Sequence, residues 1–154
     1  MLTYLAALLI GVIAGLRTFT APAAVSWAAY FGALPLAGTR LAFFGAGLTP
    51  YIFTALLIWE SIFDQLPRVP TRKSPPQVIG RVASGALCGA AVVMPHSWWV
   101  FGLCEGIIGA LIGTFAGYEL RVRLARAVGR DRPVAIIEDV VAVVAAVLIV
   151  TLLV

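Results

Sequence analysis

The sequence predicts an all-α fold, a polytopic bundle of about five transmembrane helices. Hydrophobic residues make up 62% of the 154 residues and charged residues only 12%, whereas soluble globular domains average roughly 25% charged residues. The mean hydropathy is +1.03, and the apolar runs approach the roughly 20 residues that a helix needs to cross a bilayer. We therefore expect residues 1–154 to form a single integral membrane domain whose main partner is the lipid bilayer.

The first apolar segment extends from Leu2 to about Leu34, which is too long for one simple crossing at about 1.5 Å per residue. Residues 15–22, Gly-Leu-Arg-Thr-Phe-Thr-Ala-Pro, interrupt it, so we expect a broken or re-entrant segment. A single crossing would place the N-terminus inside the cell, and a fold-back into two half-helices would place it outside. The first stretch has no basic n-region, so we expect no cleavable signal peptide.

Four further segments are each consistent with one crossing. They run from about Leu48 to Leu66, from about Val78 to Met94, from Trp98 to Leu120 and from Pro133 to Val154. Proline suits the first turn of the last helix, because no intrahelical partner is lost there.

Two basic loops set the expected orientation. Loops 67–81 and 121–132 hold nine of the eleven lysines and arginines, and short loops rich in these residues face the cytoplasm. This arrangement places the C-terminus outside. The basic loops also explain the formal net charge of +4, because their lysines and arginines are attracted to anionic lipid headgroups. We therefore expect no nucleic-acid partner.

Six of the seven acidic residues lie within or at the ends of the expected spans, and only Asp131 is clearly in a loop. A charge at the centre of a transmembrane helix costs about 2.5–3.5 kcal/mol on insertion scales, so such residues are normally paired, neutral or in contact with a wet cavity. The six are Glu60, Asp64, Glu105, Glu119, Glu138 and Asp139.

Most of these residues are expected to meet near the cytoplasmic surface. The expected cluster consists of Glu60, Asp64, Arg81, Glu119, Glu138 and Asp139. It either binds a substrate or ion, or joins the helices as a network of salt bridges, and the sequence leaves both open. Neighbouring residues in a helix point about 100° apart, so Glu138 and Asp139 can both face protein only if their helix is flanked on two sides.

Arg17 and Glu105 form a separate expected pair in the outer half. If the first segment crosses once, the two lie at similar depth and neutralise each other at a kink. Alternatively, Arg17 with the hydroxyls of Thr18 and Thr20 forms an anion site at the helix break, where free N–H groups and the helix dipole favour negative charge.

Glycines in the fourth segment suggest close helix packing. GxxxG spacing, which lets helix backbones approach closely, occurs three times among Gly102, Gly106, Gly109, Gly113 and Gly117. Packing within the chain is one interpretation. With so few helices, a second copy would readily complete a cavity, so we also expect a homodimer.

A weak parallel internal repeat is one interpretation of two short similarities. Residues 15–18, Gly-Leu-Arg-Thr, resemble Gly-Arg-Val at 80–82, and Trp59-Glu60 resembles Tyr118-Glu119. Parallel repeats are known among transporters.

Familiar catalytic motifs are missing from the sequence: it contains no HExxH, CxxC, Walker loop or Gly-x-Ser-x-Gly. We expect no cofactor, the sequence favours no enzymatic activity, and it leaves any metal site undetermined. Cys88 and Cys104 are either small packing residues or a bridge between adjacent helices.

Several of these residues also belong to a family pattern. The pattern comprises Gly-Leu-Arg-Thr-Phe-Thr-Ala-Pro-Ala-Ala at 15–24, Trp59-Glu60 with Asp64-Gln65-Leu66-Pro67, Pro70-Thr71-Arg72 and Pro75, Gly80-Arg81 with Gly85-Ala86, and Pro133 with Ile137-Glu138-Asp139. It resembles the bacterial integral-membrane family named domain of unknown function 4126, over nearly the whole chain.

That resemblance implies a bacterial cytoplasmic (inner) membrane protein and supplies no settled activity. It also implies that Arg17, Glu60, Asp64, Arg81, Glu138 and Asp139 belong to the motifs of the family. Glu105 and Glu119 are candidates from their position alone.

The function we expect is that of a small membrane transporter or channel-like protein. Its intramembrane carboxylates would couple to protons or bind a cation, and the sequence does not distinguish a small solute, an ion or a lipid as the substrate. The alternative is a non-transporting membrane scaffold or accessory subunit in which the charges are structural pairs.

Overall fold

The computed structural model describes residues 1–64, 74–96 and 98–153, with only the backbone of Arg132, and these residues form helices and no strand. The helices are α1 (Leu2–Leu16), α2 (Thr20–Tyr30), the short 3-10 helix η1 (Ala42–Gly45), α3 (Thr49–Phe63), α4 (Pro75–Val93), α5 (Trp99–Val128) and α6 (Asp131–Leu152). The predicted all-α fold is confirmed for this part of the chain.

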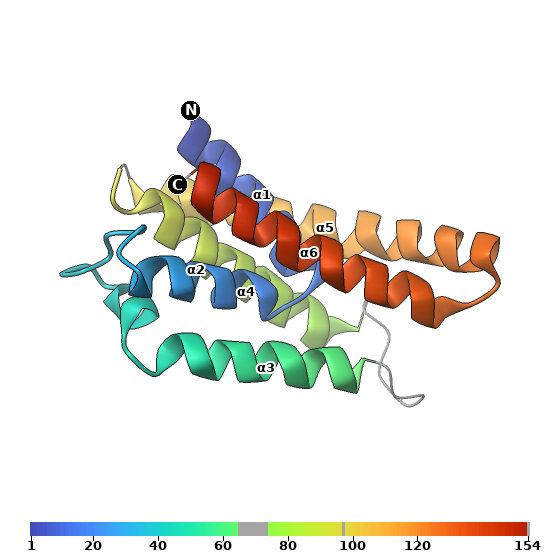
Figure 1. Cartoon of the computed structure of the whole chain (residues 1–154). Coiled ribbons are helices and arrows are strands. Elements are labelled where there is room, and N and C mark those ends of the chain that lie inside the picture. The colour runs from blue at the N-terminus through green and yellow to red at the C-terminus, as the bar shows by residue number, and fades with distance from the viewer. Residues whose placement is uncertain (65–73, 97, 154) are drawn as a thin grey trace.

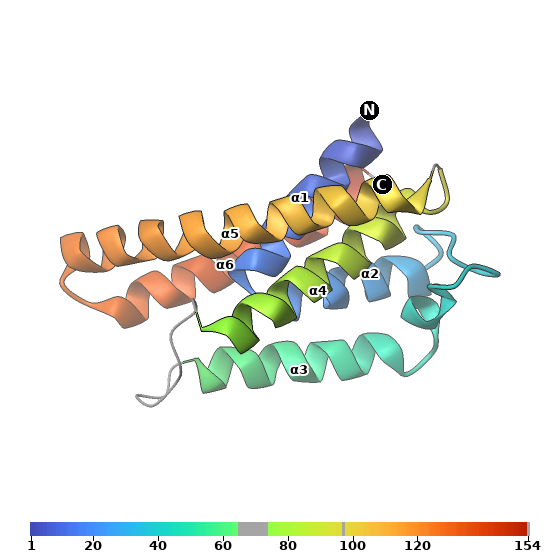
Figure 2. The ribbon, with the colours of Figure 1, turned by 180° about the vertical axis from the view of Figure 1, so that it is seen from behind.

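The α-helices lie roughly alongside one another, and successive helices alternate in direction (Figures 1 and 2). The N-terminus, the end of α6, the link between α2 and α3, and the adjoining ends of α4 and α5 all lie at one end of the bundle. The link between α5 and α6 lies at the opposite end. The N-terminus and the end of α6 therefore lie at the same end of the bundle.

The predicted interruption of the first segment is confirmed, and the chain folds back there. The helix α1 ends at Leu16, Arg17 is extended with φ −141° and ψ 120°, and α2 begins at Thr20. A continued helix would place the Pro22 ring against the carbonyl of Thr18, four residues earlier, which is the usual reason that proline ends a helix. Proline is tolerated where it stands, in the first turn of α2.

The helices α1, α4 and α5 interlock through glycines. A methyl group on Gly11 of α1 would lie 2.9 Å from the Cα of Gly106 on α5, and one on Gly85 of α4 would lie 2.6 Å from the Gly106 carbonyl oxygen. No side chain fits between backbones this close. The glycine stripe of α5 is therefore covered by α1 and α4 of the same chain and is not available to a second copy.

In the part of the chain that the structure describes, three helices are long and apolar enough to cross a membrane, rather than the five expected: α4, α5 and residues Pro133–Leu152 of α6. The other two, α1 and α3, are apolar but shorter, with 15 residues each, or about 22 Å against a hydrocarbon core of about 30 Å. The fold is thus compatible with an integral membrane protein that has fewer full-length spans than its apolar segments suggest.

Helices extend into both of the expected basic loops. The helix α5 continues past Leu120 to Val128, since Arg, Leu and Ala are all good helix formers. It ends at Gly129, whose φ of 74° is left-handed and suits a glycine C-cap. At the other loop, Arg81 lies within α4 and is buried.

Candidate functional site at the helix break

The break between α1 and α2 leaves backbone groups without helical partners, and side chains of α4 and α5 supply them. Arg81 donates from one guanidinium nitrogen to the carbonyls of Gly15 at 2.7 Å and Leu16 at 3.3 Å. The hydroxyl of Thr114 also donates to the Gly15 carbonyl, at 3.3 Å. A positive group at the C-terminus of α1 is favourable, because that end of a helix carries partial negative charge.

Glu60 supplies the matching acceptors at the start of α2. Its two carboxylate oxygens accept the backbone N–H groups of Thr18 at 2.9 Å and Phe19 at 3.0 Å. Glu60 lies on α3 and is only 7% exposed. The negative charge faces the positive end of the α2 dipole, so both ends of the broken helix are stabilised by a charge of the appropriate sign.

Arg17, within the break itself, bridges two further helices. Its side chain is 2% exposed and donates to Asp64, at the end of α3, at 2.9 Å. The Nε of Arg17 donates to Asp139 of α6 at 2.6 Å. One guanidinium therefore holds two carboxylates at once, using different nitrogens of the planar arginine fork.

The charged side chains that the structure describes around the break form a group that we call the break cluster. They are Arg17, Glu60, Asp64, Arg81 and Asp139. Two guanidinium groups and three carboxylates belong to it, and Arg81 and Asp139 have further interactions beyond those given above. Charges that are paired in this way cost far less to bury than unpaired charges.

A second group of charges joins α5 to α6. Arg121 of α5 contacts Asp131 at 2.7 Å and Glu138 at 3.4 Å. Glu138 and its neighbour Asp139 thus face different partners, Arg121 and Arg17 respectively. The requirement that the last helix be flanked on two sides is met.

The structure separates the remaining two sequence candidates from the break cluster. Glu119 is 53% exposed on α5 and pairs with Arg123 one turn away. Glu105 is half-buried on α5, and Arg17 has Asp64 and Asp139 as its carboxylate partners in place of Glu105. The expected outer pair of Arg17 and Glu105 is therefore not formed. The suggested repeat also matched residues in unlike surroundings, since Glu60 is buried and Glu119 is exposed.

Sequence reasoning missed two hydroxyl residues that complete the break. Ser84 of α4 donates to the carbonyl of Thr18 at 2.6 Å, the group that Pro22 excludes from a helix, and Thr114 bonds Gly15. Small polar residues occur throughout apolar helices, so nothing local marks these two. Cys88 is buried, Cys104 is exposed, and both are free, so the two cysteines form no bridge.

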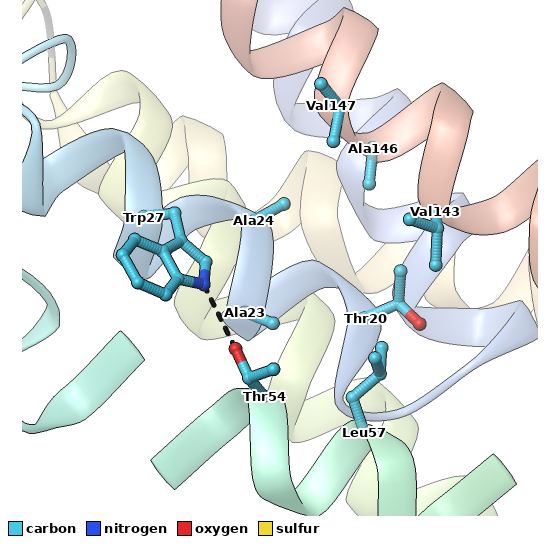
Figure 3. A pocket seen from close by; sticks show the side chains of 9 residues that line it. All are labelled: Thr20, Ala23, Ala24, Trp27, Thr54, Leu57, Val143, Ala146 and Val147. Atoms are coloured by element: carbon cyan, nitrogen blue, oxygen red, sulfur yellow. Dashed lines mark hydrogen bonds between the residues drawn. The ribbon is translucent and has the colours of Figure 1, made fainter. Parts of the chain in front are cut away.

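An apolar, partly open cavity of about 180 Å³ lies between α2, α3 and α6. Figure 3 shows its nine lining residues, with Trp27 at one end and Thr20 and Leu57 towards the other. The indole N–H of Trp27 donates to the hydroxyl of Thr54 at 3.0 Å, which fixes the ring at the edge of the cavity. Among the described residues, no group of three or more His, Cys, Asp or Glu side chains has a geometry that would hold a metal ion.

The charged side chains and the interrupted helix define a helical bundle with a polar centre at the break between α1 and α2. Comparison with known proteins adds nothing to this, because no family model, curated protein or solved structure matches the chain. The resemblance drawn from the sequence motifs therefore stays a proposal.

Proposed function

We propose that the protein is a small transporter or channel-like protein of the bacterial inner membrane, in which the break cluster takes up a proton or a small cation. The observation that carries this proposal is the group of charged side chains that converge at the break between α1 and α2. Three carboxylates share two guanidinium groups, and ionisable groups inside a membrane commonly mark proton or ion pathways.

The broken helix gives independent support. Irregular backbone at membrane depth is tolerated where it is buried in protein or lines a cavity, because its polar groups must be satisfied there. Transporters commonly use discontinuous helices, whose ends contribute partial charges to a central site. Here the ends of α1 and α2 meet Arg81 and Glu60.

Arg17 is the element that would change partners. It is shared between Asp64 and Asp139, which lie on different helices. Protonating either carboxylate, or pairing it with a cation, weakens its attraction for the guanidinium and leaves Arg17 to the other. This change of partner couples the occupancy of the site to the contact between α6 and the hairpin formed by α2 and α3.

A non-transporting scaffold is the second candidate, and one observation favours it. Both oxygens of Glu60 and several nitrogens of Arg17 and Arg81 are engaged in contacts that hold the broken helix together. In that case the charges would act only as staples between helices, and a partner protein would be required for function.

Flux measurements on proteoliposomes separate the two candidates. Purified protein is reconstituted with an internal pH-sensitive dye, and a gradient of protons or of Na⁺ or K⁺ is imposed. We expect protein-dependent flux that Asp139→Asn abolishes and that the exposed control Glu119→Gln leaves unchanged. Asp64→Asn serves as a second variant in case Asp139→Asn does not fold.

Absence of flux with any of these ions, from a folded protein in sealed vesicles, would exclude the transport proposal. Co-purification of a partner protein together with retained function in both aspartate variants would instead support the scaffold. The expected homodimer remains part of the proposal, although the glycine stripe of α5 is not the surface it would use.

A further inference from the structure

Glu105 is a carboxylate of α5 that has no partner in the part of the chain that the structure describes. Its side chain makes no hydrogen bond or ion pair there, whereas every other acidic residue has at least one. It is half-buried and lies six residues after Trp99, where α5 begins, or about 9 Å along the helix. A carboxylate at this depth in an apolar helix is costly without a partner, so Glu105 needs one from outside the chain.

The side of α5 that carries Glu105 is otherwise apolar and exposed. Figure 2 shows α5 passing in front of α1, with one side turned away from the bundle. The exposed residues on this side, together with Glu105, form what we call the α5 seam: Phe101, Glu105, Ile108, Ile112 and Phe115. Their spacings alternate between four and three, which is the pattern by which two helices pack side by side.

A second copy of the chain is the partner that fits this seam. Lipid chains would cover its apolar residues equally well, but they offer no hydrogen bond to Glu105. A twofold axis places the same surface of two copies face to face, so the two Glu105 carboxyls would meet. Two carboxyls at one site can share a proton in a hydrogen bond, and ionisable residues inside membranes commonly pair with one another.

We infer that the α5 seam is the contact between two copies of the chain, with the two Glu105 carboxyls hydrogen-bonded across a twofold axis. This inference rests on the homodimer included in the proposed function, and it names the surface that forms it. The glycine stripe of α5 is covered by α1 and α4, so the seam is a separate side of the same helix. It gives Glu105 a role that does not involve the break cluster.

Dimerisation of the full-length protein in liposomes tests the inference. Donor-labelled and acceptor-labelled proteins are mixed, and energy transfer between them is measured as the lipid-to-protein ratio is raised. We expect a dimer whose dissociation constant rises by about fivefold or more in Glu105→Leu, because a hydrogen bond between the helices is lost. Glu105→Gln should largely preserve the dimer, since two amides also hydrogen-bond each other across helices.

Two further measurements connect the dimer to the seam. Ile112→Ala removes packing without altering Glu105 and should also weaken the dimer, which keeps the test valid if Glu105→Leu fails to fold. Val144→Ala, on the exposed side of α6, should leave it unchanged. Cys104 is exposed beside Glu105 whereas Cys88 is buried, so a short bismaleimide should link two copies through Cys104, and Cys104→Ser should abolish the link.

The outcomes distinguish this inference from the proposed function. A protein that stays monomeric at every lipid-to-protein ratio would overturn the inference, since lipid or a different protein would then cover the seam. A dimer that tolerates Glu105→Leu and is not linked through Cys104 would overturn it too, because another surface would hold the copies together. Equal weakening by Glu105→Gln and Glu105→Leu would contradict the shared hydrogen bond.

Ion flux carried by a monomer would refute the seam and leave the transport proposal intact. A dimer that is linked through Cys104 and weakened by Glu105→Leu, but carries no flux, would support the seam and refute transport.

Discussion

Charged residues at the break between α1 and α2 bind specific backbone or side-chain groups, and Glu60 shows this most directly. Each of its oxygens accepts one backbone N–H, from Thr18 and from Phe19. In Glu60→Gln one oxygen becomes an NH₂ group, which faces an N–H and cannot accept it. Because a buried donor left without an acceptor costs about 1–3 kcal/mol, we expect a loss of this size in the free energy of unfolding, measured by denaturant titration in detergent.

The matched control for this prediction is Glu119→Gln. Glu119 is 53% exposed and pairs only with Arg123, four residues along α5. Exposed pairs of this kind contribute about 0.3–0.5 kcal/mol. Equal effects of the two substitutions would contradict the role assigned to Glu60.

Arg17 gives a second prediction at this scale. Its guanidinium reaches Asp64 and Asp139 from different nitrogens, whereas a lysine ammonium is a single point charge. We expect Arg17→Lys to lose one charge-assisted hydrogen bond and about 1.5–3 kcal/mol of stability. Thermal unfolding of this variant should be compared with that of Arg123→Lys on the exposed side of α5, and comparable unfolding temperatures for the two would argue against a bridging role.

Among the helices, the closest packing is that of α1, α4 and α5. In Gly85→Ala the new methyl would lie 2.6 Å from the Gly106 carbonyl oxygen and 2.8 Å from the Ala110 Cβ, so α4 and α5 must separate. Overpacking of this kind typically costs about 1–3 kcal/mol. We expect a lower unfolding temperature for this variant.

Gly80→Ala on the same helix is the matched control. The nearest atom to a methyl there is the Thr18 Cγ2, at 3.9 Å, which is ordinary contact. Alanine restricts the unfolded chain and favours a helix, so stability should rise by about 0.4–1 kcal/mol. If Gly85→Ala raises stability as Gly80→Ala does, helix propensity rather than packing controls the effect.

At the scale of the whole molecule, the N-terminus and the end of α6 lie at the same end of the bundle (Figures 1 and 2). If the proposed membrane orientation is correct, the α2–α3 link faces outward and the α5–α6 link faces the cytoplasm. We therefore expect a membrane-impermeant thiol reagent to label Thr39→Cys in intact cells and to label Arg130→Cys only after permeabilisation. Both variants are made with Cys88 and Cys104 replaced by serine, and labelling of both from outside would rule out this orientation.

Much of the architecture could be predicted from the sequence. The features that predicted it are local in the sequence: the apolar runs, the interruption at residues 15–22 and the glycine spacing of α5. Each of them has its counterpart in the bundle of alternating helices. Helix length was less accessible: α5 extends to Val128 through a basic stretch, since helix propensity does not require apolar residues. Hydropathy alone ends that segment at Leu120.

By itself, the sequence determined that the charges near Arg17, Glu60, Arg81 and Asp139 must be partnered, because unpaired charges among apolar helices are too costly to bury. Only the tertiary structure decided which charges meet. The fold-back at Pro22 brings Arg17 to Asp64 and Asp139 in place of Glu105, and it places Glu60 and Arg81 at the two ends of a broken helix. These contacts join residues far apart in the chain, so they follow from how the helices pack and not from any local pattern.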